Sequence, residues 1–385
     1  MRDTLLVLTL LVLSLLAIAL PAAAQQPVFT ALPVLEIPAS PSLGGAAVGR
    51  LSDDPRAALQ NPALLGLSAG SVRQATAVTP GAAWYGEQSM SLASASLGVE
   101  WGRVDLGLGV SQGTLGADAR TLADGTDYDP TDRYRALSAG LATRGPVRLA
   151  LGATARYVTT TDAPRWTGER YDIHSLRGVT TDLGAAVSAD VMRLAGSPAL
   201  GALRPALDVT AGYAQSHLGG TVQYAGYERQ SLPRTATVGW SAVGGLDLPA
   251  LRLVEAEVAV QADQSLVRDE DGMTRYDWAV GSLAPASALL GTGGERTTGR
   301  RGVRVELAET LSLARGRFDG WGYDDAQTRS VELRTAGAFA LLAGPSDRGP
   351  LADLRRLDLR VGRMTVWAGT PDATTRTTVS LVVGR

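Results

Sequence analysis

Apolar and polar residues alternate with a period of two along most of the chain from residue 71 onward. In the segment 104–111, Val, Leu, Leu and Val alternate with Asp, Gly, Gly and Ser, and the pattern recurs at 147–157, 207–213, 254–260, 303–308 and 331–341. Successive side chains of a strand point to opposite faces. Each segment therefore predicts a strand with one apolar face and one face of small, polar or charged residues.

Turn-rich stretches separate these segments, so the candidate strands can be counted. Candidate strands begin near residues 71, 89, 102, 133, 147, 178, 205, 234, 251, 302, 310, 327, 354 and 374, and the weakest additional candidate begins near 275. Single-chain bacterial barrels have an even number of strands, each about 9–11 residues long, so we leave out the candidate at 275. The prediction is an all-β fold, a transmembrane antiparallel β-barrel of about fourteen strands over residues 71–385.

Soluble β-sandwiches, propellers and solenoids also alternate and remain an alternative. The composition favours the barrel, because charged residues make up 19% of the chain, against about 25% in soluble domains. Aromatic residues are only 5%, which would make a thin interfacial girdle. Several of them, such as Trp101, Trp240 and Trp367, nevertheless lie near predicted strand ends, where interfacial aromatics belong.

The N-terminus has the pattern of a secretory signal peptide. Arg2 precedes an apolar run from Leu5 to Leu20, and small residues follow Pro21. We assign residues 1–24 to the signal peptide, with an N-terminal membrane anchor as the alternative. No later stretch approaches 18 consecutive apolar residues, so a membrane location requires a closed barrel.

Residues 25–70 lack the alternation and read as an extended lead-in followed by a compact segment. That segment contains two glycines, two acidic residues before a proline, and an Asn-Pro pair; they are Gly44, Gly45, Asp53, Asp54, Pro55, Asn61 and Pro62. Asp54 before Pro55 suits an N-cap followed by proline in the first turn, which predicts a short helix over 55–59. An ordinary helix cap and plain turns are the alternative interpretation of these residues.

This segment resembles the N-terminal hatch of the FadL long-chain fatty-acid transporter family, and more closely its PorV/PorQ branch. The matching features are the small-residue run at 44–49, the turn Asp53-Asp54-Pro55 and the tripeptide Asn61-Pro62-Ala63, which holds the only Asn of the chain. Leu232-Pro233-Arg234 is similar to a strand start in PorV relatives. The resemblance implies a plug, or hatch, formed by residues 25–70 inside the lumen.

A barrel of fourteen strands has a lumen wider than its own side chains can fill. A hatch would fill it, and lumen-facing charges would hold the hatch and pair with one another. The candidate lumen charges are Arg148, Arg156, Glu255, Glu257, Arg304, Glu306, Glu332 and Arg334, with Arg360, Asp208 and Asp358 as further partners.

Candidate catalytic chemistry is sparse. The chain has no Cys and two His, His174 and His217, which we interpret as loop residues. We find no G-x-S-x-G motif and expect no enzyme activity, cofactor or metal site. The net charge of -2 gives no footprint for nucleic acid.

The expected location is the bacterial outer membrane, with outer-membrane lipid as a partner. The motifs favour a PorV-like role in passage or docking of cargo in type IX secretion, with secretion-system proteins as partners. A FadL-like transporter of a hydrophobic small-molecule ligand is the first alternative, and a secreted or surface structural or adhesive β-protein is the second.

Overall fold

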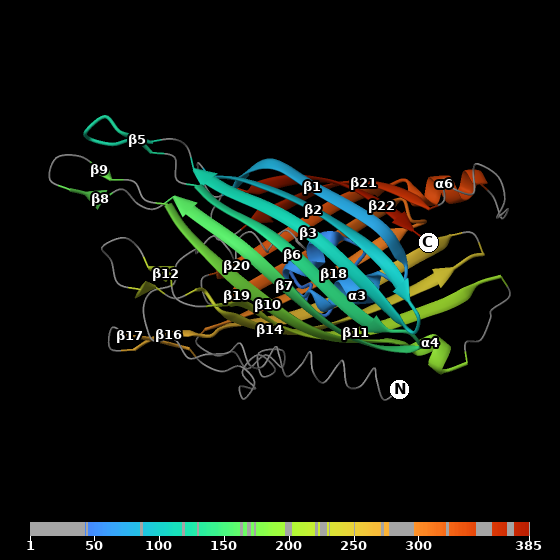
Figure 1. Cartoon of the computed structure of the whole chain (residues 1–385). Helices are drawn as coiled ribbons and strands as arrows, with labels where there is room; N and C mark the ends of the chain where they lie inside the picture. Colours follow the sequence, from blue (N-terminus) through green and yellow to red (C-terminus); the bar gives the residue numbers. More distant parts are fainter. Residues whose placement is uncertain are drawn as a thin grey trace, which may run out of the picture.

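The chain forms a closed antiparallel barrel in the computed structural model (Figure 1). The structure describes residues 43 and 45–384, apart from gaps at 85–87, 118–119, 129–130, 162–164, 168–170, 173–174, 197–201, 220–221, 224–228, 231, 250, 271–272, 277–295, 321–322, 344–355 and 368–372. The predicted signal peptide and lead-in, residues 1–42, and Gly44 lie outside the described residues.

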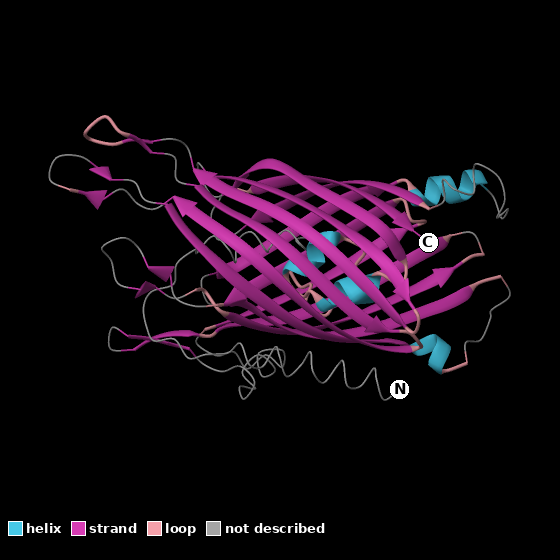
Figure 2. Cartoon of the chain, in the orientation of Figure 1, coloured by secondary structure: helices cyan, strands magenta, loops and turns pink. Residues whose placement is uncertain are grey.

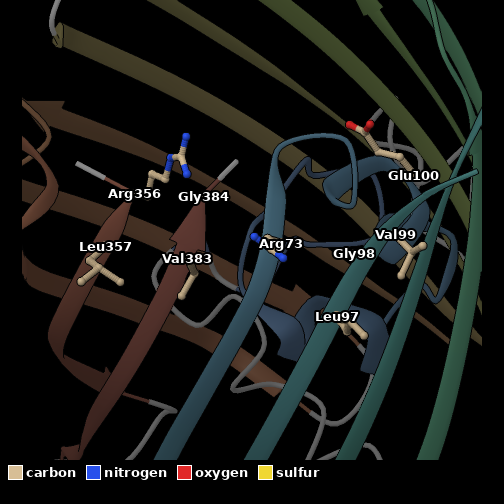
Figure 3. Close-up of a pocket in the computed structure, with 9 residues that line it drawn as sticks. All are labelled: Arg73, Leu97, Gly98, Val99, Glu100, Arg356, Leu357, Val383 and Gly384. Carbon is tan, nitrogen blue, oxygen red and sulfur yellow. The ribbon is translucent and has the colours of Figure 1, made fainter. Parts of the chain in front are cut away.

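Fourteen strands make up the barrel wall, each hydrogen-bonded to its neighbours in chain order. They are β1 (Val72–Trp84), β2 (Gln88–Trp101), β3 (Val104–Ala117), β6 (Thr131–Thr143), β7 (Val147–Thr161), β10 (Ser175–Asp190), β11 (Arg204–Leu218), β14 (Thr235–Asp247), β15 (Arg252–Ser265), β18 (Thr297–Leu307), β19 (Leu311–Gly320), β20 (Tyr323–Arg334), β21 (Leu357–Trp367) and β22 (Thr374–Gly384). The wall closes where β1 pairs with β22 (Figure 3).

The predicted strand number is confirmed. Each predicted start lies within five residues of an observed one, and the largest difference is between 302 and Thr297, the first residue of β18. The weak candidate near 275 is β17 (Met273–Tyr276), which among the described residues pairs with β16 (Val267–Glu270) in a two-stranded sheet outside the barrel. Leaving it out was therefore correct.

The two ends of the barrel differ (Figure 1). At one end, here named the loop end, four connections carry small hairpins: β4–β5 (Arg120–Thr121 and Asp127–Tyr128), β8–β9 (Arg165–Trp166 and Tyr171–Asp172), β12–β13 (Val222–Gln223 and Arg229–Gln230) and β16–β17. The other end, here named the turn end, carries helices α4 (Val191–Leu194) and α6 (Ala336–Ala343) and the C-terminal end of β22.

The outer face of the wall is apolar. Large exposed apolar side chains occupy alternate positions of successive strands, among them Leu108 and Val110 on β3, Val147 and Leu149 on β7, Val303 and Val305 on β18, and Val379 and Leu381 on β22. Such a surface is stable only against lipid. The closed barrel with this surface replaces the soluble sandwich, propeller and solenoid alternatives.

The segment 331–341 departs from its predicted strand. Strand β20 ends at Arg334, and residues 336–343 form α6. The sequence AGAFALLA has no polar residue to alternate with its apolar ones, and its Ala and Leu residues favour a helix. The strand prediction was therefore wrong beyond Arg334. Among the helices that the structure describes, none is long and apolar enough to cross a membrane.

The fold predicts heat-modifiable behaviour. We expect the unheated protein to migrate faster than the boiled protein on a denaturing gel, because a barrel closed by β1–β22 pairing resists detergent until it is heated. Recovery of the folded protein in water without detergent would contradict a membrane barrel.

Candidate functional site

The lumen is occupied by the hatch, defined here as the described residues of 43–70 (Figure 2). It contains the 3-10 helix η3 (Pro55–Leu59) and the helix α3 (Ala63–Ser68). The Asp54 carboxylate accepts a hydrogen bond from the backbone N–H of Arg56, 2.9 Å away, and so caps η3. The predicted bounds of this first helix are those observed, whereas α3, which begins directly after Pro62, was interpreted only as a turn.

Glycines bring the hatch backbone against the wall backbone. We name seven of them the glycine belt: Gly107, Gly140, Gly152, Gly184, Gly212, Gly239 and Gly302. A Cβ atom on any of them would lie less than 3 Å from a hatch atom. On Gly140 it would be 2.5 Å from the Pro62 carbonyl oxygen and 2.7 Å from the Gly66 nitrogen. No ordinary Cβ contact is that short, so these seven wall positions need a residue without a side chain.

The belt follows from strand register. Gly107 pairs with Gly140, Gly140 with Gly152, and Gly152 with Gly184, across β3, β6, β7 and β10. The hatch has matching glycines of its own: a Cβ on Gly66 would lie 2.6 Å from the Leu141 carbonyl carbon of β6. The contact is thus made backbone to backbone.

An apolar cluster lies beside the belt. From the hatch it contains Ala57, Ala63, Leu64 and Leu67, and from β6, β7 and β10 it contains Ala142, Ala150 and Ala186. All seven residues are at most 8% exposed. Burial of these side chains stabilises the hatch on this side of the lumen by the hydrophobic effect.

Asn61 connects hatch and wall by hydrogen bonds. Its side-chain amide donates to the Val48 carbonyl at 2.7 Å and to the Ala185 carbonyl of β10 at 3.1 Å. Its side-chain oxygen accepts from the Ala63 backbone N–H at 3.1 Å, at the start of α3. A side chain with both donors and an acceptor is needed here, and Asn61 is fully buried.

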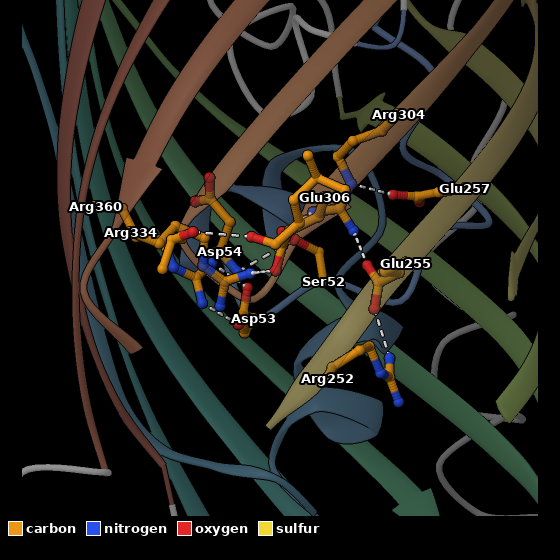
Figure 4. Close-up of polar contacts among 12 residues, drawn as sticks. Ser52, Asp53, Asp54, Arg252, Glu255, Glu257, Arg304, Glu306, Arg334 and Arg360 are labelled. Carbon is orange, nitrogen blue, oxygen red and sulfur yellow. Dashed lines mark hydrogen bonds and ion pairs between the residues drawn. The ribbon is translucent and has the colours of Figure 1, made fainter. Parts of the chain in front are cut away.

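The opposite side of the lumen holds a chain of ion pairs that begins and ends on the hatch (Figure 4). We name it the ionic circuit. Its members run through β15, β18, β20 and β21 in the order Arg50, Glu257, Arg304, Glu306, Arg334, Asp358, Arg360 and Asp53. Successive N–O distances lie between 2.5 and 2.9 Å, for example 2.7 Å for Arg50 to Glu257 and 2.6 Å for Arg360 Nη1 to Asp53 Oδ1.

The arginines of the circuit keep the Asp53 carboxyl group ionised. Burial alone would raise the pKa of Asp53, but Arg360 beside it, with Arg334 and Arg304, holds that pKa well below its usual range. An acid with a depressed folded pKa stabilises the fold above its unfolded pKa of about 4, and that stability is lost as pH falls through the folded pKa. The Asp53 contact is therefore fully formed at neutral pH.

Three hatch contacts were not predicted from the sequence. Arg56 donates from Nη1 to Thr79 of β1 and Thr378 of β22, each at 3.1 Å, and so bridges the strands that close the barrel. Gln261 of β15 accepts from the backbone N–H groups of Ala47 and Val48 at 2.7 and 2.9 Å. Ser241 of β14 donates to the Gly49 carbonyl at 2.9 Å. Single polar residues on a lumen face carry no sequence signal that distinguishes them.

The remaining predicted residues lie around the part of the wall that contacts the hatch, here named the seat. Gly45 has a φ of +81°, which only glycine adopts without strain. A Cβ atom at this residue would lie 2.7 Å from Nη1 of Arg300. Arg148 of β7 donates to the Leu67 carbonyl at 2.9 Å. Glu255 pairs with Arg304 and with Arg252, and Glu332 is half-buried on β20.

Arg156 belongs to a separate buried cluster at the loop end. It donates to Asp182 of β10 at 2.6 Å, contacts His217 Nε2 at 3.0 Å, and lies over the Tyr134 ring at 5.2 Å from its centroid. Its partner Asp182 was not among the predicted acids. The cluster does not contact the hatch through these bonds.

The interpretation of His217 as a loop residue was wrong. It lies in β11, fully buried, and its Nδ1 is 3.0 Å from the Pro233 carbonyl. Because a carbonyl only accepts, Nδ1 carries the proton and Nε2 accepts from Arg156, which is the neutral tautomer. The cluster thus fastens the segment before β14 to the wall. His174 lies outside the described residues.

No set of three His, Asp or Glu side chains suited to a metal ion occurs within the described residues.

Comparisons with known proteins show a similarity in fold, and the sequence identity is low. No family model matches the chain, and no curated protein matches it. Among solved structures, the chain is similar to the toluene transporter TbuX of Ralstonia pickettii (11% identity, 90% of this chain and 97% of that chain, TM-score 0.47). It is also similar to the monoaromatic hydrocarbon channel CymD (10%, 90% and 97%, TM-score 0.40) and to OccAB1 of Acinetobacter baumannii (11%, 82% and 95%, TM-score 0.34). These values do not establish membership of a family.

A single methyl group on the glycine belt should displace the hatch. We expect Gly140→Ala to destabilise the hatch by about 1–3 kcal/mol, as overpacking does. The chain has no Cys, so Ala57→Cys, at a position 3% exposed, can report on this by its rate of reaction with a maleimide. The rate should rise in Gly140→Ala. Gly244→Ala on β14 is the control, because the nearest atom to its Cβ is 4.0 Å away; equal rates in both variants would contradict the belt.

Removal of the Asn61 side chain should also loosen the contact between hatch and wall, here by a change on the hatch. Asn61→Ala leaves the Val48 and Ala185 carbonyls without this donor, which costs about 1–3 kcal/mol for a buried polar group. We expect a lower midpoint of thermal unfolding in detergent and faster proteolysis within the hatch. An unchanged midpoint and an intact hatch would contradict this role of Asn61.

Proposed function

We propose that this chain is an outer-membrane channel of FadL type that lets small hydrophobic molecules pass when its hatch shifts. The observation that carries the proposal is the asymmetric seat of the hatch. One side rests on glycines and alanines of β3, β6, β7 and β10, and the other is held by the ionic circuit.

The location follows from the surface. A barrel with an apolar outer face needs a bilayer, and single-chain bacterial barrels of even strand number with longer loops at one end are outer-membrane proteins. The predicted signal peptide, residues 1–24, would route the chain there. By the same rule, the short turns face the periplasm and the hairpin loops face outward.

The substrate class follows from what a shifted hatch would expose. Moving it off its seat uncovers Ala142, Ala150 and Ala186 on the wall and Leu64 and Leu67 on the hatch. The resulting passage would have an apolar lining, which suits an apolar solute better than an ion or a sugar. The circuit residues keep partners on the wall when the hatch leaves, since Arg304, Glu306, Arg334 and Asp358 bond to one another.

A second candidate is the PorV-like role in type IX secretion. It rests on the motifs at 53–55, 61–63 and 232–234 alone, and no contact in the barrel and no comparison supports a secretion-system partner. In that case the hatch would be a fixed seal and the loops would dock cargo.

Uptake by intact cells tests the proposal. Cells lacking the chain should take up labelled toluene several-fold more slowly than cells that carry it; toluene is the compound for which one structure of similar fold is described as a transporter. We further expect Asp53→Asn combined with Arg360→Gln to raise uptake, because it removes the ion pair between the wall residue Arg360 and the hatch residue Asp53.

The matched control is Asp319→Asn combined with Arg317→Gln, an exposed pair 3.5 Å apart on β19. It removes the same two charges without touching the hatch and should leave uptake unchanged. Equal uptake with and without the chain would overturn the transport proposal. Loss of secreted proteins from the medium of cells lacking the chain would support the secretion role instead.

A further inference from the structure

An arginine patch interrupts the apolar outer face of the wall on β18, β19, β20 and β21. We define the arginine patch as four exposed residues near the middle of these strands, one on each: Arg301, Arg315, Arg329 and Arg363. They share the outward side of their strands with exposed apolar residues two positions away, such as Val303, Leu313 and Val361. The patch therefore belongs to the surface that faces lipid.

Strand register brings like charges together in the patch. Arg315 lies directly opposite Arg329 across β19 and β20, and Arg301 lies directly opposite Arg317 across β18 and β19. Arg363 is one outward position from the β21 partner of Arg329. Like charges directly opposite one another on neighbouring strands are destabilising. The folded wall thus contains a repulsion that an anion among the arginines would offset.

The contacts of the patch are made to neutral groups. Arg315 donates from Nη2 to the Gln327 side-chain oxygen, 3.5 Å away, and the Arg329 guanidinium lies 5.4 Å from the centroid of the Trp367 ring. Within the described residues, no ion pair joins any of the four patch arginines to an acid. Trp367 ends β21 at the loop end, and tryptophans near strand ends mark the level of lipid headgroups. The patch therefore carries positive charge close to that level.

The acids of the same four strands do not cancel this charge. Asp319 is 3.5 Å from Arg317, which stands outside the patch for that reason. Besides the acids assigned to the lumen, β18–β21 contain only Asp319, Asp324 and Asp325. Setting all three against the four patch arginines and Arg317 gives 5 − 3, an excess of two positive charges. The outer face of these strands is therefore complementary to an anion.

The patch begins at a depth that apolar residues cover elsewhere on the wall. Counted from the turn end, the outward residues of β7 are apolar or aromatic from Val147 as far as Tyr157. On β18 the apolar run ends at Val303, and Arg301 follows. A tilted strand crosses the hydrocarbon layer in about 9–11 residues, and an arginine that faces lipid costs more free energy the deeper it lies. An anionic group beside these arginines would lower that cost.

We propose that the arginine patch binds a phosphorylated lipid of the outer leaflet, with its phosphates among the patch arginines and its acyl chains along Leu313, Val331 and Val361 toward the turn end. The planar guanidinium donates paired N–H bonds to phosphate, and four arginines on adjacent strands suit a headgroup with more than one phosphate. The site lies outside the wall and is independent of transport through the lumen. Its assignment to the outer leaflet rests on the proposed orientation, with the hairpin loops outward.

Native mass spectrometry of the full chain in a nonionic detergent tests the site. The protein is titrated with bisphosphoryl lipid A and, separately, with monophosphoryl lipid A of the same acyl chains. We expect the wild-type protein to retain the bisphosphoryl form several-fold better than the monophosphoryl form. Arg315→Gln combined with Arg329→Gln should lose that preference, and the bisphosphoryl form should raise the midpoint of thermal unfolding of the wild-type protein but not of this variant.

The matched control is Arg133→Gln combined with Arg135→Gln, two exposed arginines on outward positions of β6. Arg135 lies opposite the neutral residues Gln112 and Tyr157, so this variant should keep the preference. Heat-modifiable migration shows that each variant is folded. Equal retention of the two lipids by the wild-type protein, or an equal loss of preference in both variants, would overturn the proposal. Full displacement by millimolar inorganic phosphate would overturn the assignment to a lipid, because a free anion would then suffice.

Discussion

Contact between the backbone of the hatch and the backbone of the wall is the constraint on which the rest of this structure depends. The lumen of fourteen strands is too wide for wall side chains to fill, and a hatch of about thirty residues fills it only if it comes close on all sides. The glycine belt permits that approach on β3, β6, β7, β10, β11, β14 and β18. The positions of Asn61, Pro62 and α3 follow from it, since each of them contacts a strand at one of these glycines.

The ionic circuit is the electrostatic counterpart of that contact. Buried charges are costly unless they are paired, and the lumen face of β15, β18, β20 and β21 carries many of them. They are stable because each arginine lies between two acids, and the chain of pairs ends on the oppositely charged hatch residues Arg50 and Asp53. The wall thus provides an apolar, sterically specific seat along β3, β6, β7 and β10. On the other side it provides charge-specific contacts beside a smaller apolar cluster of Leu43, Ala46, Ala259 and Ala314.

The sequence predicted the wall better than the seat, and the reason is the range of the interactions. Strand existence depends on period-two alternation within ten residues, so fourteen strands and the short helix capped by Asp54 could be derived. Every circuit residue except Arg50 was among the candidate lumen charges or hatch acids, because the same alternation turns the wall charges inward. The glycine belt depends on the register between strands, which no single segment encodes, and α3 and the buried His217 depend on contacts with residues more than fifty positions away.

The difference between the two sides of the seat also bears on how the hatch could move. Separation from the glycine belt exposes the apolar side chains beside it, among them Ala63, Leu64 and Leu67. Separation from the circuit breaks only its two ends, because Glu257 keeps Arg304, and Arg360 keeps Asp358. Release of Arg50 and Asp53 therefore leaves the wall members of the circuit paired, and the hatch is expected to detach first on the charged side of the lumen. Under the proposed transport role, movement of the freed hatch off the belt then uncovers the apolar residues Ala142, Ala150 and Ala186, along which an apolar solute would pass.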